Sequence, residues 1–355
     1  MRIATLSDAG VVHTRRWVEE FRARGHDVGV WSLELPPPGF AVERLPRLPL
    51  PGWARYPLAA PALARALERF APDLVDAHFL PNYGLLGALA GRRPLSVTVW
   101  GSDLLVAGNR NALQRARARF VLERADLVLA DAENLAAAAR ALGAVPERVR
   151  TIPWGVDLGR FRPAAARASG LLVSARMHEP VYDVATILHG VKPVLESRPY
   201  ARLVVVGEGR LRPALERLAA RLLPAGRWQF AGRLPAAELA ALLARAEVYL
   251  SASRSDSTSL SLLEAMAAGA IPVVSDIEGN REWVADGEGA RLFPCGDAAG
   301  LARALEQALS EEAWAAGARA RNRRVVEERA DWGRNLGRIE ALFSGLVDAR
   351  RGGSA

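Results

Sequence analysis

A repeated alternation of short apolar strands with longer amphipathic helices is the feature of this sequence that most limits its fold. One run of the pattern begins at the apolar segment Ile3–Leu6, and a second run begins at Leu171–Ser174. Strands that alternate with helices form parallel sheets, because each helix carries the chain back to the start of the next strand. The pattern therefore predicts an α/β protein with two doubly wound, Rossmann-like parallel sheets.

The length of the chain agrees with two domains, since 355 residues suffice for two at about 100–200 residues each. We place the first domain at 1–165 and the second at 166–331, with the small, flexible segment Ala164–Gly170 as a hinge. The last helix, within 332–355, is expected to join the first domain. Ligands of such sheets bind at the carboxyl ends of the strands, so we expect the domains to face each other across a cleft.

The composition excludes several classes of protein. The single cysteine, Cys295, rules out an internal disulfide framework. No apolar run reaches the roughly 18–20 residues of a membrane helix, and Met1–Ser7 becomes polar too soon for a signal peptide, so we expect a cytoplasmic location. The net charge of +8 lies mostly in residues 1–165, where 22 arginines face 16 acidic residues. An anionic partner suits this balance, but nucleic acid is not expected, because zinc-finger spacings, RNP-like motifs and a basic tail are absent.

The segment after the apolar strand Val248–Leu250 carries the strongest functional signal. Residues 253–259 are mostly small and polar, and they lead into a helix that contains Glu264. Small residues before a helix leave backbone N–H groups free, and these groups and the helix dipole bind anions such as a diphosphate. A carboxylate one turn inside that helix can accept two hydrogen bonds from a cis-diol, as a ribose offers. The alternative is that Asp256 and the serines only cap the helix.

Two other strand ends of the second half fit an anionic ligand. Arg176 follows the first of these strands and can form a bidentate pair with phosphate oxygens. Gly207 and Gly209 follow another strand, where missing side chains let a ligand approach. Position 212 is Arg, so the Gly-x-Gly-x-x-Gly motif of nicotinamide dehydrogenases is absent. The Gly-x-Ser-x-Gly motif of serine hydrolases and the His-x-x-x-His and Asp-x-Asp metal patterns are also absent, so we expect neither a serine nucleophile nor a metal.

Polar residues also follow the strands of the first half. His78 ends one strand, Gly101-Ser102-Asp103 follows the next, and Asp8 to His13 follow the first. A histidine in such a place can hydrogen-bond a sugar hydroxyl or transfer a proton. A residue of this kind, taken alone, is more often a satisfied polar group of the fold, so these residues support a site only when taken together.

Together, the motifs resemble those of the family 4 glycosyltransferases, which have the GT-B fold. The most specific blocks are Leu263–Gly269 and Ile152–Pro163. Three further elements, Glu179–Tyr182, Asp256–Ser259 and Asn280–Trp283, resemble an envelope-polysaccharide-like branch of this family. The resemblance runs almost from end to end, through Gly25–Val28, Pro72–His78, Trp100–Asp103, Val206–Gly209, Phe230–Gly232 and Pro272–Asp276.

The resemblance implies a retaining glycosyltransferase that needs no metal or cofactor and moves a hexose-type sugar from a nucleotide-diphosphate donor to a glycan or lipid-linked acceptor. Glu264 would bind the donor ribose, and Asp256, the first carboxylate of the family's Glu-x7-Glu motif, would lie beside the donor sugar. The remaining implied contacts are Arg176, Gly207 and the N–H groups of Ser259 and Leu260 at the phosphates, His78 at the sugar, Glu282 on the donor side, and His13, Gly101 and Asp103 on the acceptor side.

Three departures from the family pattern affect this interpretation. The first motif carboxylate is the shorter Asp256, and position 181, where the family usually has a second phosphate-binding cation, a lysine, is Val181. Asp8–His13 replaces the usual Gly-Gly of the first loop. A diphosphate leaving group gains negative charge, and without a metal it needs cations or N–H groups. We therefore hypothesise that Arg254 or Arg281 supplies the second cation.

The departures leave other functions open. A degenerate family member would bind a nucleotide or glycan without catalysis, and a GT-B epimerase would act on a nucleotide sugar alone. Contact with an anionic membrane at the inner face of the cell membrane is a separate hypothesis, because a helix over 110–124 carries five arginines beside apolar Leu113 and Phe120. The alternative for that helix is a core-packed element with a solvated basic face.

Overall fold

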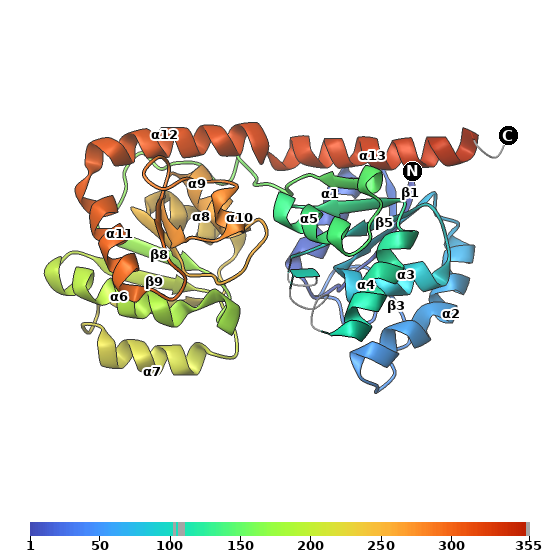
Figure 1. Cartoon of the computed structure of the whole chain (residues 1–355), viewed down its shortest axis with the longest axis horizontal. Coiled ribbons are helices and arrows are strands. Elements are labelled where there is room, and N and C mark those ends of the chain that lie inside the picture. Colours follow the sequence, from blue (N-terminus) through green and yellow to red (C-terminus); the bar gives the residue numbers. More distant parts are fainter. Residues whose placement is uncertain (102–103, 106–110, 353–355) are drawn as a thin grey trace. The chain divides into compact units, whose positions relative to one another are not determined.

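The structure is a computed structural model, and it describes residues 1–101, 104–105 and 111–352. The chain forms two compact units, each an α/β structure around one parallel sheet (Figure 1). Unit 1 comprises Met1–Ile152 and Leu336–Ala355, and unit 2 comprises Pro153–Asn335.

The division between the units differs from the boundaries placed at residues 165 and 332 from the sequence. Val156 and Phe161, which precede residue 165, are buried in the core of unit 2. The N–H of Val156 donates to the carbonyl of Ala330 at 2.7 Å, and its carbonyl accepts from the N–H of Trp332 at 3.1 Å. These bonds hold the segment before the predicted hinge to unit 2.

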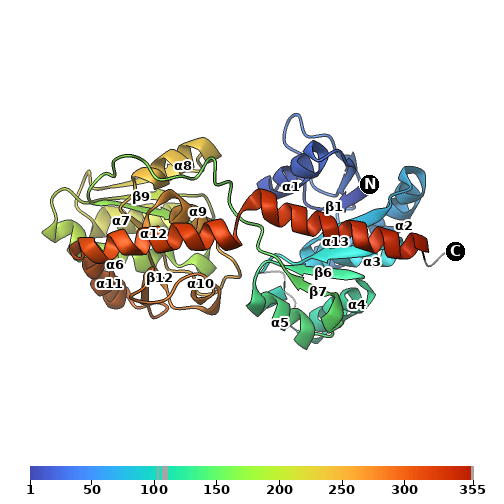
Figure 2. The same cartoon turned by 90° about the horizontal axis from the view of Figure 1, so that it is seen from above.

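Unit 1 has a seven-stranded sheet in the order β3-β2-β1-β4-β5-β6-β7, with every neighbouring pair parallel. On one face, helix α3 packs against both α2 and α4. On the other face, α1 and α13 lie next to each other (Figure 2). The ring of Phe21 on α1 stacks on that of Phe343 on α13, with the ring centres 5.6 Å apart. The strands are β1 (Arg2–Leu6), β2 (Asp27–Ser32), β3 (Glu43–Arg44), β4 (Leu74–His78), β5 (Leu95–Thr98), β6 (Leu127–Ala130) and β7 (Val149–Thr151), and the helices are α1 (Val12–Ala23), α2 (Gly52–Phe70), α3 (Leu85–Ala90), α4 (Ala112–Arg124), α5 (Glu133–Ala141), the 3-10 turn η3 (Pro146–Arg148) and α13 (Trp332–Gly352).

Two helices of unit 1 have unusual local features. Helix α3 is preceded directly by a π-helical turn, η1 (Phe79–Gly84), which continues into it. Helix α2 begins within the proline-rich residues 35–57 and contains Pro57 and Pro61. Burial of Tyr56 and Leu63 on this helix supplies packing that compensates for its internal prolines.

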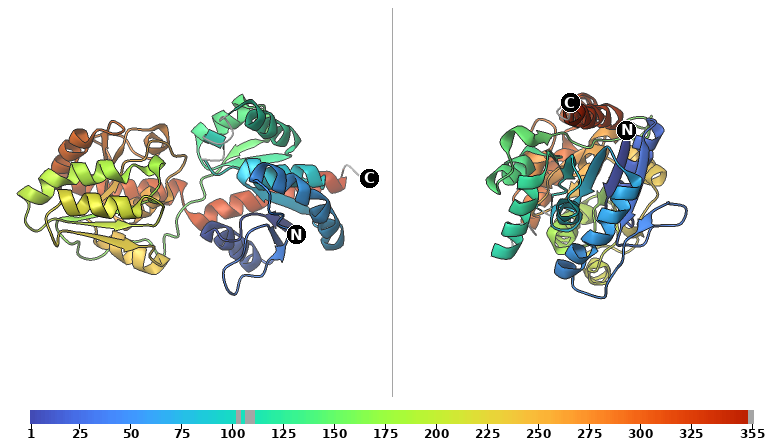
Figure 3. Two further views of the ribbon diagram at one scale, coloured as in Figure 1. Left: turned by 90° about the horizontal axis from the view of Figure 1, so that it is seen from below. Right: turned by 90° about the vertical axis from the view of Figure 1, so that its right-hand side faces the viewer.

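Unit 2 has a six-stranded parallel sheet in the order β10-β9-β8-β11-β12-β13. Alternate strand residues enter two separate cores, as Leu172 and Val173 of β8 do, so both faces of the sheet are buried. Helices α6 and α7 lie side by side on one face (Figure 3), while α8 and α9 pack on the other. The strands are β8 (Leu171–Ala175), β9 (Arg202–Val206), β10 (Trp228–Gly232), β11 (Val248–Ser251), β12 (Ile271–Ser275) and β13 (Arg291–Phe293), and the helices are the 3-10 turn η4 (Pro180–Tyr182), α6 (Val184–Ser197), α7 (Arg212–Leu222), α8 (Ala236–Arg245), α9 (Leu260–Ala268), α10 (Glu278–Arg281), α11 (Ala298–Ser310) and α12 (Glu312–Arg329).

The final helix closes the structure of unit 1. Arg24 donates to Glu340 of α13 at 3.0 Å, and the ring of His26 hydrogen-bonds the same carboxylate at 2.7 Å. Within the described part of the chain, no helix combines the length and apolar character that crossing a membrane requires.

Candidate functional site

Four neighbouring strands of unit 2 end at one edge of the sheet, and three of them lead into residues that the sequence assigned to a donor site. In the order β9, β8, β11 and β12, their carboxyl ends lead into Gly207, Arg176, the loop 252–259 and Asp276. Parallel strands end at the same edge of a sheet, which is where ligands of such sheets bind. The fold therefore gathers the predicted donor residues at one edge of unit 2.

Arg176 lies at the centre of this edge. Its guanidinium forms an ion pair with Asp256 and donates hydrogen bonds to the hydroxyls of Ser259 at 2.5 Å and Ser261 at 3.2 Å. Only 8% of the Arg176 side chain is exposed, and its guanidinium carbon lies 4.3 Å from the ring centre of Tyr182. Burial opposes the charge, but the Asp256 carboxylate holds the pKa of Arg176 above its ordinary value. Arg176 is therefore a fixed cation at the start of α9.

The start of α9 offers further groups that bind anions. Ser259 is the N-cap residue, and its Oγ accepts a hydrogen bond from the N–H of Leu262 at 3.4 Å. Leu260 begins the helix, and the first N–H groups of a helix have no acceptor within it. Residues 262–268 are buried except Glu264, which is partly exposed one turn after Leu260. The Arg176 guanidinium thus lies at the start of α9, and the Glu264 carboxylate follows one helical turn later.

Glycine is needed at positions 207 and 209 because of close backbone packing, and not because a ligand approaches there. Both have positive φ angles, of 129° and 157°. A Cβ atom at Gly207 would lie 2.2 Å from the carbonyl oxygen of Arg176, and one at Gly209 would lie 2.5 Å from that of His178. The glycines are therefore needed because the loop after β9 packs directly on the segment that carries Arg176.

The two arginines considered as a second cation are both paired. Arg254 donates to Asp183 at 2.7 Å, and its backbone N–H donates to the carbonyl of Val181 at 2.8 Å. Arg281 donates to both carboxylate oxygens of Asp276, at 2.5 and 2.7 Å. The structure thus places Arg254 beside the position where the family usually has a lysine, and it binds Arg281 more firmly to its own partner.

Glu282 directly follows α10 and is partly exposed. Helix α10 packs closely on the loop before α9, because a Cβ atom at Gly279 would lie 2.2 Å from the carbonyl oxygen of Ser257. Glu282 therefore lies next to an element that contacts the loop, and its own backbone carbonyl accepts a hydrogen bond from Arg329 at 2.9 Å.

In unit 1, His78 ends β4 and is fully buried. Its Nε2 hydrogen-bonds Asp76 at 2.9 Å, and Asp76 also accepts from Trp17 at 3.0 Å and from Thr98 at 3.3 Å. The ring of Trp17 meets the imidazole edge-on at 4.9 Å. Sequence reasoning did not assign Asp76 a role, although residues two apart on a strand share a face. Asp76 fixes the orientation of the His78 ring.

The other first-half residues gather around Trp100. The rings of His13 and His78 lie 5.7 and 5.5 Å from that of Trp100, and Phe79 stacks on it at 4.6 Å. Gly101 is buried with a φ angle of 92°, a value that favours glycine. Asp103 lies outside the described residues. The structure thus brings His13, His78 and the residue before Gly101 together.

A cluster at the carboxyl ends of β1 and β2 was missed from the sequence. Glu34 accepts hydrogen bonds from Tyr56 at 3.2 Å and from Tyr83, whose hydroxyl also bonds Ser32 at 3.0 Å. Burial raises the pKa of Asp8, the Glu34 carboxylate raises it further, and the Gly10 N–H opposes both. Its position near the end of a strand was the only sequence signal for Glu34, because no recognisable motif surrounds this residue.

No group of three or more His, Cys, Asp or Glu side chains that could hold a metal ion occurs among the described residues. The expectation that the reaction needs no metal stays a prediction.

Family models match both units of the chain. Residues 10–160 match the model described as "Glycosyltransferase Family 4", and residues 168–311 match the one described as "Glycosyl transferases group 1". A GDP-mannose-dependent alpha-mannosyltransferase of Mycolicibacterium smegmatis is 30% identical over 322 residues, which cover 80% of this chain and 82% of the relative. A phosphatidyl-myo-inositol mannosyltransferase of the same species is 33% identical over 188 residues, 51% of this chain. That match spans only about half of the relative, 48%.

Two solved structures are similar to this chain over nearly its whole length. Sucrose-phosphate synthase of Thermosynechococcus elongatus has a TM-score of 0.85 at 20% identity, covering 98% of this chain and 100% of its own. HepE of Anabaena in complex with UDP-glucose has a TM-score of 0.82 at 18% identity, with the same coverage of 98% and 100%. At these identities the likeness concerns the fold, which is GT-B.

Proposed function

The chain belongs to glycosyltransferase family 4, and from this premise we propose that it is a retaining, metal-independent glycosyltransferase. The donor is a hexose-type sugar on a nucleotide diphosphate, and the acceptor is a glycan or lipid-linked molecule of the cell envelope. The names of the mannosyltransferase relatives and of the UDP-glucose complex support this class of donor. No nucleic acid partner and no cofactor are part of the proposal.

The position of the Arg176 guanidinium at the start of α9 is the observation that carries the proposal. When a sugar leaves its donor, negative charge develops on the diphosphate, and fixed cations and N–H groups stabilise it. Arg176 and the N–H groups of Ser259 and Leu260 supply both kinds of group. Glu264, one turn further on, is placed to accept hydrogen bonds from the ribose diol. Family resemblance implies that the acceptor attacks on the face from which the diphosphate leaves, with a donor phosphate taking its proton, so we assign no protein nucleophile.

Asp256 has a more specific proposed role than its place in the motif implies. The sequence placed it beside the donor sugar, and its carboxylate forms the ion pair with Arg176. Both side chains are largely buried, so the pair holds the guanidinium in one orientation. The same pair cancels part of the charge that a diphosphate would meet. We assign Asp256 to positioning Arg176, at some cost in donor affinity.

Arg254 is the better candidate for the second cation. Its guanidinium donates a hydrogen bond to Asp183, whereas that of Arg281 is held by two hydrogen bonds to Asp276. Arg254 therefore loses fewer hydrogen bonds than Arg281 when it leaves its carboxylate partner for a donor phosphate. Its backbone is bonded to Val181, the position of the family's lysine. Arg254→Ala is expected to weaken nucleotide-diphosphate binding more than Arg281→Ala, and equal effects would contradict this choice.

Unit 1 supplies the proposed contacts to sugar and acceptor. His78 is held by Asp76, and the rings of Trp17 and Trp100 lie beside its imidazole. His13 lies beside the same tryptophan, Trp100. Aromatic rings and a carboxylate surround His78, so this edge suits a hydroxyl-bearing ligand better than an anion.

We propose that the protein contacts the inner face of the cell membrane, and that the basic side of α4 makes this contact. Val121 and Leu122 are buried in the core of unit 1, while Leu113 is 57% exposed. The apolar side of the helix therefore faces the protein, which is the alternative that the sequence left open. Arg115, on the same helix, would attract anionic lipids from the surface without insertion of the helix.

Incubation with one nucleotide sugar at a time, without acceptor, tests the proposed activity. Slow release of nucleotide diphosphate and of a free sugar with retained configuration is expected, and Arg176→Ala should abolish it. A new nucleotide sugar would instead identify an epimerase. Binding without any turnover would favour a non-catalytic protein, an alternative that the pairing of Arg176 with Asp256 supports.

A further inference from the structure

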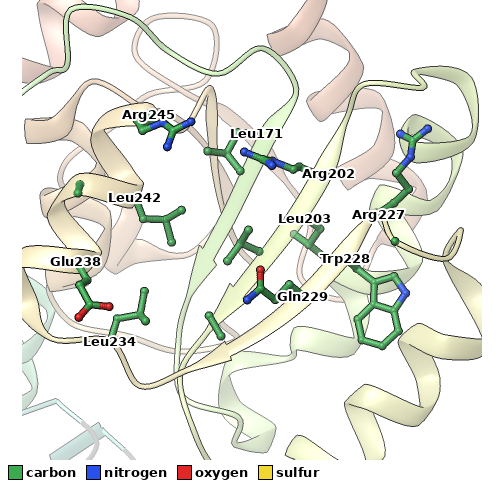
Figure 4. A pocket seen from close by; sticks show the side chains of 14 residues that line it. Leu171, Arg202, Leu203, Arg227, Trp228, Gln229, Leu234, Glu238, Leu242 and Arg245 are labelled. Atoms are coloured by element: carbon green, nitrogen blue, oxygen red, sulfur yellow. The ribbon is translucent and has the colours of Figure 1, made fainter.

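Unit 2 contains a pocket that lies far along the strands from Arg176. It has a volume of about 670 Å³ and lies between α8 and the edge of the sheet (Figure 4). Its walls include the first residues of β8, β9 and β10, which are Leu171, Arg202 and Trp228. Arg176 and Gly207 follow the opposite, carboxyl ends of β8 and β9. The pocket is therefore separate from the proposed donor site.

The floor of the pocket is apolar. Leu171 and Val204 come from the sheet, Leu242 comes from α8, and Leu234 comes from the loop before that helix. Leu171 is fully buried, whereas Val204, Leu234 and Leu242 remain partly exposed. Helix α8 packs on β8 and α9, so the outer strands β9 and β10 leave this apolar strip open beside it. A hydrocarbon chain would gain free energy by covering the strip.

Two arginines converge at one end of the strip. Arg202 reaches over the sheet from β9, Arg245 reaches from the last turn of α8, and their side chains point toward each other across Leu171 (Figure 4). Both are exposed, and within the described part of the chain neither forms an ion pair. Like charges that converge repel each other, and a phosphate between them would accept hydrogen bonds from both.

The other charged residues of the pocket do not balance these two. The guanidinium of Arg227 is already bonded to the backbone carbonyls of Arg198 at 3.3 Å and Ala201 at 2.9 Å. Glu238 lies on the same face of α8 as Arg245 but seven residues earlier, which is about 10 Å along a helix. The pocket therefore has one cationic end, an apolar middle and an acidic residue at its far end.

We propose that this pocket binds a single-chain lipid phosphate, with its phosphate between Arg202 and Arg245 and its chain along Leu171, Leu242 and Leu234. The pocket volume lies within the range of about 300–1,000 Å³ that is usual for small-molecule sites. A guanidinium presents paired N–H groups that match two phosphate oxygens, so two of them hold one phosphate firmly. Unit 2 would then bind this lipid independently of the donor site.

Titration calorimetry of the full chain with dodecyl phosphate, below its micelle concentration, tests this site. Saturable binding is expected that excess UDP does not displace, together with at least about tenfold weaker binding of inorganic phosphate and of dodecyl maltoside, because each lacks one half of the recognition. The double variant Arg202→Ala, Arg245→Ala should lose about tenfold or more in affinity. Arg221→Ala, on the exposed side of α7, is the matched control and should bind as the wild type does.

Three results would overturn the proposal. Displacement by UDP would place the phosphate in the donor site instead. Equal binding of dodecyl maltoside would leave the arginines without a role, and equal binding by the double variant would do the same. Thermal unfolding of each variant is measured alongside, and both replaced arginines are exposed, so the fold should be retained. Arg245→Lys keeps the charge but not the paired N–H groups, and an intermediate affinity is expected for it.

Discussion

At the carboxyl edge of its sheet, unit 2 carries a buried arginine, whereas unit 1 carries a buried histidine. Arg176 is surrounded by a carboxylate and by hydroxyls at a helix start, while His78 is surrounded by tryptophan rings and held by Asp76. The two sheets share one architecture, so the fold alone does not decide what each edge binds. The side chains after the strands do: one edge suits an anion and the other a neutral, hydroxyl-bearing ligand.

The aspartates of the two edges act on their partners in different ways. Asp256 faces a group that is charged in any case, so it removes part of a positive charge from the edge of unit 2. Asp76 faces an imidazole and orients its ring. Replacing Asp256 by asparagine should therefore change nucleotide affinity as well as turnover, whereas replacing Asp76 by asparagine should change turnover alone.

The largest expected effect is that of Arg176→Ala. The change removes the cation at the start of α9 and leaves the Asp256 carboxylate largely buried without its partner. We expect kcat/KM for the donor to fall about 10³-fold or more and the free energy of unfolding to fall by about 3–5 kcal/mol. Steady-state kinetics and urea unfolding measure the two. Arg176→Lys, which keeps a charge, is the control, and a loss of kcat/KM below about tenfold in the alanine variant would argue against an anion site.

Next in size is Glu264→Ala. Loss of the hydrogen bonds to a ribose diol should weaken nucleotide binding about 100-fold, because bonds to a charged group contribute strongly. Glu264 is partly exposed, so thermal stability should barely change. Calorimetry measures the nucleotide affinity. The affinity of Glu264→Gln should lie between those of the wild type and the alanine variant. Unchanged nucleotide affinity in the alanine variant would remove Glu264 from the site.

His78→Asn sharpens the comparison by changing unit 1 alone. Acceptor-dependent turnover is expected to fall about 10- to 100-fold, whereas the affinity for free nucleotide should stay within about twofold of the wild type. Asp76→Asn should give a smaller loss of turnover, since it only loosens the ring. A parallel fall in nucleotide affinity would show that the two edges do not work independently.

Asp256→Asn tests the opposing role of the carboxylate in unit 2. Arg176 would then present its full charge, so nucleotide diphosphate should bind about three- to tenfold more tightly. Turnover should fall because the guanidinium is held less firmly. Asp256→Glu keeps the pair and should resemble the wild type. If the asparagine variant bound nucleotide more weakly, Asp256 would have to contact the donor directly.

The smallest expected effect is a pH dependence at Asp8. Its pKa is raised in the folded protein, chiefly by burial, so the folded state holds this proton more tightly than the unfolded state. The stabilising contribution is present below the unfolded pKa, near 4, and is lost as pH rises through the folded pKa. It should be less than about 1 kcal/mol, because solvent screens a half-buried group. Urea unfolding of wild type and Asp8→Asn between about pH 3.5 and 6 should show a fall in stability with pH that the variant lacks.

Much of the fold and the donor edge could be predicted from sequence, because both depend on local patterns. Alternating strands and helices predict parallel sheets, and a residue directly after a strand, such as Arg176 or Gly207, must lie at the carboxyl edge. Small residues before a helix likewise mark Ser259 as an N-cap. In each case the signal lies within a few residues of the chain.

The partners across the sheet could not be predicted in the same way. The pairing of Arg176 with Asp256 joins residues 80 positions apart, and no local pattern specifies which of several strand ends meet. The close packing of Gly207 on the Arg176 carbonyl is likewise a contact between two loops, so the glycine looked like an opening for ligand. The arginine pocket beside α8 combines a strand start with a helix end that no motif connects.

Calorimetric titration with UDP, GDP, ADP, TDP and CMP, on the wild type and on Glu264→Ala, tests most directly whether the edge of unit 2 is a nucleotide-diphosphate site. One of these nucleotides should bind with micromolar affinity to the wild type, and the variant should lose that binding. If none of them bound, or if the variant bound as tightly as the wild type, the edge built around Arg176 and α9 would not be the donor site.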